Sequence, residues 1–103
     1  MSTIKVRAKA EGDLVTVKCL MRHPMETGQR IDSDTGEIVP AHYIQEVRCE
    51  LKGTRVLTAA WGPSISENPY LSFIISGAAR GDTIAISWTD NKGESDSLQA
   101  TIV

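Results

Sequence analysis

The feature that most constrains the fold of this chain is a two-residue alternation of apolar and polar side chains, repeated in short segments. Successive side chains of a β-strand point to opposite faces, so such a segment buries one face and leaves the other in water. In residues 14–22 the inward face would consist of Val15, Val17, Cys19 and Met21, with Leu14 and Leu20 on the wetter side. The alternation predicts seven strands, at residues 4–10, 14–22, 43–51, 55–61, 70–76, 83–89 and 95–103.

Turn-forming residues separate these segments, and no convincing helical period interrupts them. The Asp90-Asn91-Lys92-Gly93 run predicts a hairpin turn with Gly93 at a positive φ. Short strands at this spacing are typical of an antiparallel sandwich or barrel, and we favour an all-β sandwich because one face of each strand is apolar. The inward faces of two later strands are expected to be Tyr43, Val47, Cys49 and Leu51 in one, and Ile84, Ile86 and Trp88 in the other.

The length of 103 residues fits a single domain that spans residues 1–103. The net charge of −2 and the pI of about 5.6 argue against a nucleic-acid partner. No apolar run reaches the length of a membrane span, so no membrane partner is expected. The first residues lack the apolar stretch of a signal peptide, which by itself predicts a cytoplasmic protein.

The connection from residue 23 to residue 42 is the least strand-like part of the chain. Loops longer than about 12–15 residues are usually functional or hold some structure of their own. Pro24 cannot donate to a sheet ladder, Gly28 permits a backbone angle that other residues avoid, and residues 32–37 are typical of a hairpin tip. We interpret the region as a short ribbon that a rigid scaffold presents to a partner; a plain strand-end connection is the alternative.

Soft metal ligands recur at every other position from residue 19 to residue 25, as Cys19, Met21, His23 and Met25. Such a set suits copper, and a copper or electron carrier is the alternative function. A blue-copper site needs two histidines, however, and the only other one is His42. We therefore favour buried Cys and Met as core residues and predict no metal site and no cofactor.

Other kinds of site fit less well. The run that begins at Asp32 starts like a calcium loop, but its glycine is one place early and Tyr43 occupies the twelfth position. Two histidines leave little for nucleophilic catalysis, so no catalytic residue and no enzymatic activity are predicted; an acid/base pair of His23 and Glu26 is the enzymatic alternative. Cys19 and Cys49 point inward, which favours two free thiols, although the sequence leaves their pairing open.

Four blocks, at residues 23–30, 43–49, 66–73 and 88–93, resemble the SoxZ family in order and spacing. The His-Pro-Met-Glu-Thr-Gly and Asn-Pro-Tyr motifs are the specific ones. The resemblance implies an immunoglobulin-like β-sandwich that is the non-catalytic subunit of a bacterial thiosulfate-oxidation carrier. Its heterodimer partner would be SoxY, which carries sulfur intermediates on a cysteine near its own C-terminus and presents them to the other enzymes of the pathway through transient contacts.

The resemblance also implies a periplasmic protein without its own signal peptide, exported with the partner. Residues 99–103 contain no Gly-Gly-Cys tail, which fits SoxZ and not SoxY. We expect the two loops of the specific motifs to lie at one end of the sandwich and to flank the partner's arm. The expected partner-binding residues are His23, Pro24, Met25, Glu26, Gly28, Arg30, Asn68, Pro69 and Tyr70, and an exposed interface of this kind can form a homodimer when the chain is alone.

Overall fold

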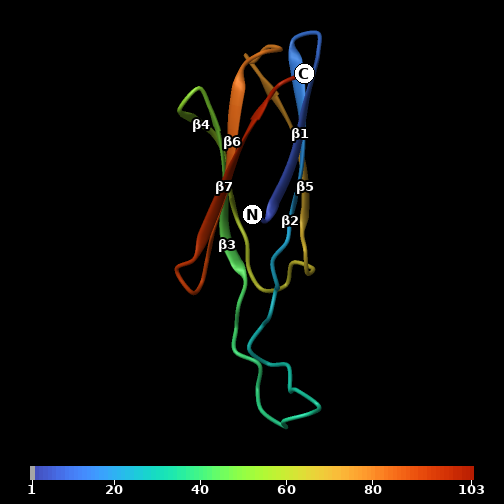
Figure 1. Ribbon diagram of the computed structural model, residues 1–103, viewed down its shortest axis with the longest axis vertical. Coiled ribbons are helices and arrows are strands. Elements are labelled where there is room, and N and C mark those ends of the chain that lie inside the picture. The colour runs from blue at the N-terminus through green and yellow to red at the C-terminus, as the bar shows by residue number, and fades with distance from the viewer. Residues whose placement is uncertain (1) are drawn as a thin grey trace.

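Seven strands build the fold in the computed structural model, which describes residues 2–103 (Figure 1). They are β1 (Ile4–Glu11), β2 (Leu14–Met21), β3 (Ile44–Leu51), β4 (Thr54–Ala60), β5 (Tyr70–Ser76), β6 (Thr83–Asp90) and β7 (Ser95–Thr101). They form two antiparallel sheets, one in the order β1-β2-β5 and the other in the order β4-β3-β6-β7. The predicted all-β sandwich of about seven strands is confirmed.

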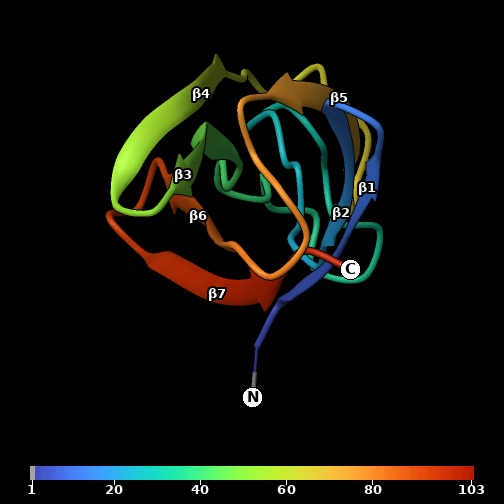
Figure 2. The same ribbon diagram turned by 90° about the horizontal axis from the view of Figure 1, so that it is seen from above.

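The two sheets face each other across one apolar core (Figure 2). The pairing of β2 with β5 and of β3 with β6 is the arrangement of an immunoglobulin-like sandwich. The C-terminus also joins the two sheets along one edge, because Ala10 N donates to Val103 O at 2.8 Å and Val103 N donates to Ala8 O at 3.0 Å. This edge of the sandwich is therefore partly closed.

The period-two pattern correctly identifies most of the core. The predicted inward residues of β2 and β6 are all buried: Val15, Val17, Cys19, Met21, Ile84, Ile86 and Trp88. On β3 the prediction for Tyr43 is wrong, because the register shifts between Ile44 and Glu46 and places Ile44, which is fully buried, on the inward face. A β-bulge inserts an extra residue and so breaks the alternation at this point.

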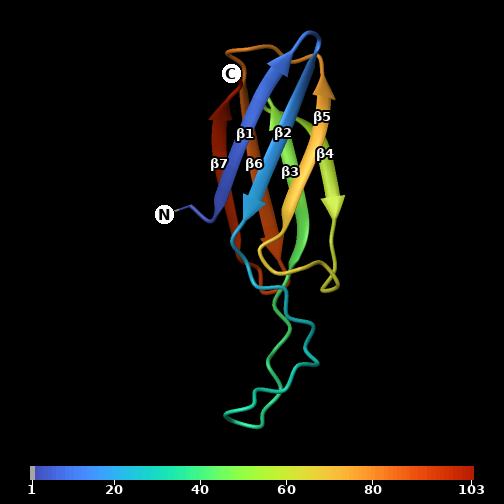
Figure 3. The ribbon, with the colours of Figure 1, turned by 90° about the vertical axis from the view of Figure 1, so that its right-hand side faces the viewer.

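The molecule is elongated, with extents of 53 × 24 × 21 Å, since residues 23–42 project from one end of the sandwich (Figure 3). The loop 61–69 and the turn between β6 and β7 lie at that same end (Figure 1). Within residues 2–103, no helix has the length and apolar character that crossing a bilayer requires.

Candidate functional site

The loops of the two specific motifs meet at one end of the sandwich. His23 N donates to Asn68 Oδ1 at 3.1 Å, and Asn68 N donates to His23 O at 3.1 Å. Asn68 has a φ of 51°, a left-handed conformation that Asn adopts more readily than most residues. Met21 N donates to Pro69 O at 3.0 Å and continues the pairing toward β2 and β5. The expectation that the two loops lie at the same end is confirmed.

Residues 23–42 form a narrow two-stranded ribbon. Isolated antiparallel bridges join Glu26 to His42 near the sandwich and Ile31 to Ile38 near the far end. The backbones of Glu26 and His42 exchange two hydrogen bonds, of 2.8 and 3.0 Å. The ribbon is thus held mainly by its own backbone, beyond the edge of either sheet.

The tip of the ribbon is a hairpin turn, as predicted. Asp32 N donates to Glu37 O at 2.9 Å, and Gly36 N donates to Asp32 O at 2.8 Å. Nearer the base, Gly28 has a φ of +85°, and a Cβ at this position would lie 3.2 Å from the Cβ of Ala41. Gly28 therefore allows both the turn of one ribbon strand and its close approach to the other.

A buried polar cluster fixes the base of the ribbon to β6. Asp90 Oδ2 lies 2.9 Å from His23 Nε2 and 2.9 Å from His42 Nε2, so one oxygen receives both rings. The His23 ring also packs edge-on against the rings of His42 and Trp88, with centroids 4.6 Å apart in each pair. Its other nitrogen, Nδ1, contacts the carbonyl oxygen of Pro24. Asp90 and His23 are only 2% and 4% exposed.

The second oxygen of Asp90 is held by the hairpin turn. The backbone N–H groups of Lys92 and Glu94 donate to Asp90 Oδ1 at 3.0 and 2.8 Å. Burial by itself raises the pKa of this carboxyl, but the hydrogen bonds from His23, Glu94, His42 and Lys92 outweigh it and hold the pKa below its ordinary value. Asp90 is therefore an ionised carboxylate aimed at the ribbon base.

Three of the residues expected to bind a partner turn inward instead. His23 is buried in the cluster, and Pro69 is buried between the loops. Met25 is half-buried against the core, where Ile44 N approaches its Sδ at 3.5 Å. Met25, expected in an exposed interface, is thus only partly accessible, because its side chain packs against the core at the start of β3.

The other expected partner-binding residues remain accessible to differing degrees. Pro24, Arg30, Asn68 and Tyr70 are exposed, and Tyr70 has 59% of its surface in water. Glu26 is half-buried and accepts bonds from Arg30 Nε and Nη2, the shortest at 2.9 Å, so the two charges form a pair within the ribbon. The hypothetical acid/base pair of His23 and Glu26 is not assembled, since His23 pairs with Asp90 and Glu26 with Arg30.

Both cysteines are free and buried, as predicted. The Cys19 thiol donates to Leu71 O at 3.5 Å, on the neighbouring strand β5. Burial raises the pKa of each thiol to about 11, with a further contribution from Cys49 at Cys19 and from Glu50 at Cys49. Neither cysteine has the exposure or the positive surroundings of a reactive thiol.

The chain matches the family described as sulphur oxidation protein SoxZ over residues 4–101. It belongs to the SoxZ family. Membership of this family gives the chain a role in sulfur oxidation. Comparison with curated proteins finds no match. The SoxZ match includes every strand and both loops of the site, so the role and the geometry concern the same part of the chain.

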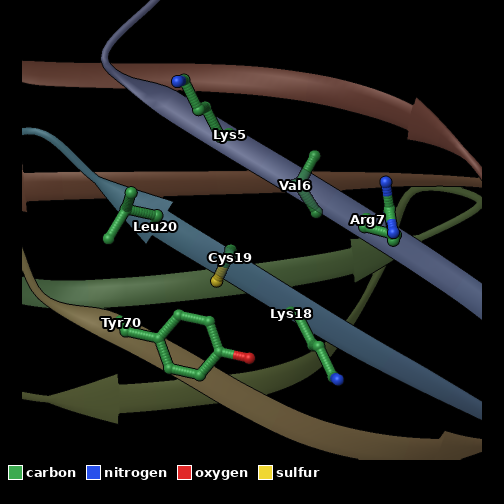
Figure 4. Close-up of a pocket in the computed structure, with 7 residues that line it drawn as sticks. All are labelled: Lys5, Val6, Arg7, Lys18, Cys19, Leu20 and Tyr70. Carbon is green, nitrogen blue, oxygen red and sulfur yellow. The ribbon is translucent and has the colours of Figure 1, made fainter.

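In this SoxZ chain the structure also reveals a surface that sequence reasoning missed, on the outer face of the β1-β2-β5 sheet. Leu20 lies directly opposite Tyr70, and the exposed Ile74 lies on the same face four residues further along β5. Arg7 on β1 lies directly opposite Lys18 on β2. A shallow hollow lies between these rows (Figure 4). We call this surface the outer β1-β2-β5 face; its exposed apolar and basic residues are Lys5, Arg7, Lys9, Leu14, Lys18, Leu20, Tyr70 and Ile74.

A second exposed apolar feature lies near the end of the ribbon. Ile31 and Ile38 face each other across a bridge and are 64% and 63% exposed. The sequence signal for this pair was the presence of two isoleucines on either side of a polar tip. Both apolar features of the SoxZ chain are accessible in the isolated domain.

Proposed function

We propose that this chain is the non-catalytic subunit of a heterodimeric sulfur carrier. Its partner is a SoxY-like protein whose C-terminal cysteine bears the sulfur intermediates of thiosulfate oxidation. The observation that carries the proposal is the state of the two cysteines. A sulfur-oxidation protein whose own thiols are buried, with pKa values of about 11, has no thiolate suited to hold cargo at neutral pH. The carrier thiol then has to come from another chain.

The outer β1-β2-β5 face is the surface that suits such a partner. Stable interfaces have an apolar centre and a polar rim. Leu20, Tyr70 and Ile74 supply apolar contacts on β2 and β5, with the Lys18–Ser72 pair between the Leu20–Tyr70 pair and Ile74. Lys5 and Arg7 supply a basic rim on β1. The complementary surface on the partner is apolar with an acidic border.

The ribbon projects from one end of the sandwich, beyond the outer β1-β2-β5 face (Figure 3). Its base is fixed to β6 through His23 and Asp90, and its exposed Ile31–Ile38 pair lies far from the sheets. In the proposed complex the ribbon reaches alongside the partner and flanks its mobile arm. The complex works in the periplasm, where it meets the other thiosulfate-oxidation enzymes, and the chain travels there with its partner.

Co-purification tests this proposal. The chain is expressed with a SoxY-like protein encoded beside it, and only the partner carries a tag. A stable one-to-one complex is expected by size-exclusion chromatography with light scattering. If the untagged chain is recovered entirely in the flow-through, the heterodimer proposal fails.

Two matched variants locate the interface. Ile74→Glu places a carboxylate in the apolar centre and is expected to abolish co-purification. Val56→Glu places the same charge at an exposed apolar position on β4, in the other sheet, and is expected to leave the complex intact. A wild-type chain that self-associates when alone should become monomeric with Ile74→Glu. Loss of the complex with Val56→Glu and retention with Ile74→Glu would move the interface to the other sheet.

A further inference from the structure

The side-chain cluster at the ribbon base consists of His23, His42 and Asp90. Hydrogen bonds between neutral imidazoles and a carboxylate do not satisfy all the donors and acceptors of this cluster. His23 Nδ1 faces the carbonyl oxygen of Pro24, which only accepts, and Nε2 lies 2.9 Å from Asp90 Oδ2, another acceptor. A neutral imidazole has one ring hydrogen, so it can donate to only one of these acceptors at a time. A cation at Nε2 would complete the second contact.

We propose that His23, His42 and Asp90 form a binding site for a divalent first-row metal ion, with Zn²⁺ as the ion that the donor set favours. The atoms concerned are His23 Nε2, His42 Nε2 and Asp90 Oδ2, which all lie within 4.8 Å of one another. Two imidazole nitrogens and a carboxylate oxygen are an ordinary ligand set for Zn²⁺. The site is independent of the proposed carrier function, since it uses only residues of this chain.

Two of the three spacings are close to what the ion needs. Bonds of about 2.0–2.1 Å in a tetrahedral site put neighbouring ligand atoms about 3.3 Å apart. The two spacings around Asp90 Oδ2 are 2.9 Å each, so each would open by about 0.4 Å. The two ring nitrogens lie within 4.8 Å of each other and would also have to reach about 3.3 Å, a movement that falls on His42, which is half-buried at the edge of the cluster.

The surrounding groups orient the ligands in the way that metal sites require. Metal-binding histidines usually donate their second ring nitrogen to a carbonyl or carboxylate, which fixes the tautomer. The Pro24 carbonyl does this for His23, and the backbone N–H groups of Lys92 and Glu94 hold Asp90 through its other oxygen. The lone pairs of Nε2 and Oδ2 are thereby left free to face the ion.

A fourth ligand stands on the solvent side. Glu94 Oε1 is 3.4 Å from His42 Nε2, and the Glu94 side chain is 64% exposed, so it can rotate toward the cluster. Two neutral imidazoles and two carboxylates would exactly balance the charge of a divalent ion. The exposed Glu94 and the half-buried His42 also give the ion a route from solvent.

The ion would have a structural role. His23 begins the ribbon, His42 ends it, and Asp90 belongs to β6, so a single ion would join both ribbon strands to the sheet. The orientation of the ribbon relative to the outer β1-β2-β5 face would then depend on metal occupancy. The candidate copper set of Cys19, Met21, His23 and Met25 shares only His23 with this site.

Metal titration of the full chain, freed of metal by a chelator, tests the proposal. Calorimetry with Zn²⁺ is expected to give one site per chain, and Co²⁺ is expected to give the visible absorption of a tetrahedral complex. Imidazole ¹⁵N NMR should show both Nε2 signals shifting together as one equivalent of Zn²⁺ is added. Absence of saturable binding, or a ring signal that does not move, overturns the site.

Two variants and a control assign the ligands. His42→Gln keeps a hydrogen-bonding side chain but removes the nitrogen ligand, and the Kd for Zn²⁺ should rise by more than the ~10–100-fold typical of losing a supporting group. Glu94→Gln should raise it by a smaller factor, and Glu37→Gln at the exposed ribbon tip should not change it. Zn²⁺ that binds His42→Gln as tightly as wild type is an adventitious ion and refutes the assignment. If His42→Gln does not fold, the ¹⁵N shifts of the wild-type chain and the Glu94→Gln titration decide the question.

Discussion

The outer faces of the two sheets satisfy their charges in different ways. On the β4-β3-β6-β7 sheet, Arg48 donates to Glu46 Oε1 at 2.8 Å, to Thr89 Oγ1 at 3.1 Å and to Ser87 Oγ at 3.2 Å. On the β1-β2-β5 sheet, Arg7 lies opposite Lys18, and like charges in direct opposition are destabilising. Arg48 thus has its partners within the chain, whereas in the proposed complex an acidic surface laid across the second face would offset the like charges of Arg7 and Lys18.

The inner faces of the same two sheets do not differ in this way. Each contributes a fully buried apolar row to one core, including Val17 from one sheet and Ile86 from the other. The buried inner faces therefore do not distinguish the two sheets, and the difference between them lies in their outer faces. This contrast supports the proposed partner surface, and the predictions below test it from the largest expected effect to the smallest.

Removing the aromatic anchor of the outer β1-β2-β5 face should have the largest effect. Tyr70→Ala is expected to weaken binding of the SoxY-like partner by about 2–4 kcal/mol, as for a central hot-spot residue. The free energy of unfolding should change by only about 0.5 kcal/mol, because the side chain is exposed. Calorimetry of the complex and urea unfolding measure the two quantities. Val56→Ala on β4 is the control, and equal losses in the two variants would remove the distinction between the faces.

The two cysteines should behave alike, although they come from different sheets. With pKa values raised from 9.0 to about 11, each has about 100-fold less thiolate near neutral pH than an ordinary thiol. A thiol reagent should therefore label both only slowly in native buffer and rapidly in denaturant, as followed by mass spectrometry. Rapid labelling of Cys19 alone would mean that the reagent reaches the inner face of the β1-β2-β5 sheet.

The same shifts predict how stability depends on alkaline pH. The folded-state pKa of each thiol lies above the unfolded value, so the unfolded chain ionises first as pH rises. Stability should consequently fall between about pH 9 and about pH 11. Urea unfolding of the wild-type chain and of Cys49→Ala across this range measures the effect. An unchanged slope in Cys49→Ala would contradict a contribution from this thiol.

Charge reversal on the basic rim should have a smaller effect. Arg7→Glu is expected to slow association with an acidic partner surface about tenfold at low salt, because charges at the rim act mainly on the association rate. The difference should shrink as salt screens the charges. Stopped-flow or surface-based kinetics at two salt concentrations measure it. Arg55→Glu on β4 changes the same charge on the other sheet and should leave the rate unchanged.

The smallest effect is expected on the outer face of the β4-β3-β6-β7 sheet, where Arg48 has hydrogen-bond partners within the chain. Arg48→Ala should lower the free energy of unfolding by about 1 kcal/mol, since it removes hydrogen bonds to Glu46, Ser87 and Thr89. Partner affinity should not change. Arg7→Ala is the counterpart and should alter stability by no more than about 0.5 kcal/mol. A larger stability loss in Arg7→Ala than in Arg48→Ala, measured by urea unfolding, would reverse the comparison.

Much of the fold could be predicted from the sequence because it depends on local periodicity. The alternation in β2 and β6 identified their inward rows, and the Asp-rich run identified the ribbon tip. The bulge at Ile44 was not predictable in the same way, because it depends on how β3 pairs with β6. The partial burial of Met25 was not predictable for a related reason: it results from the contact with Ile44 at the start of β3, which no local pattern encodes.

The features of the site can be divided in the same way, into those that depend on local sequence and those that depend on long-range contacts. The sequence by itself determined the strands, the inward cysteines, the two loop motifs and the resemblance to the SoxZ family, all of which depend on residues close together along the chain. Only the tertiary structure brought His23 to Asp90, 67 positions away, and placed the basic row of β1 beside Lys18 on a chain whose net charge is −2. Such clusters depend on which strands become neighbours. That choice is made by long-range backbone pairing, and the identity of any single residue does not reveal it.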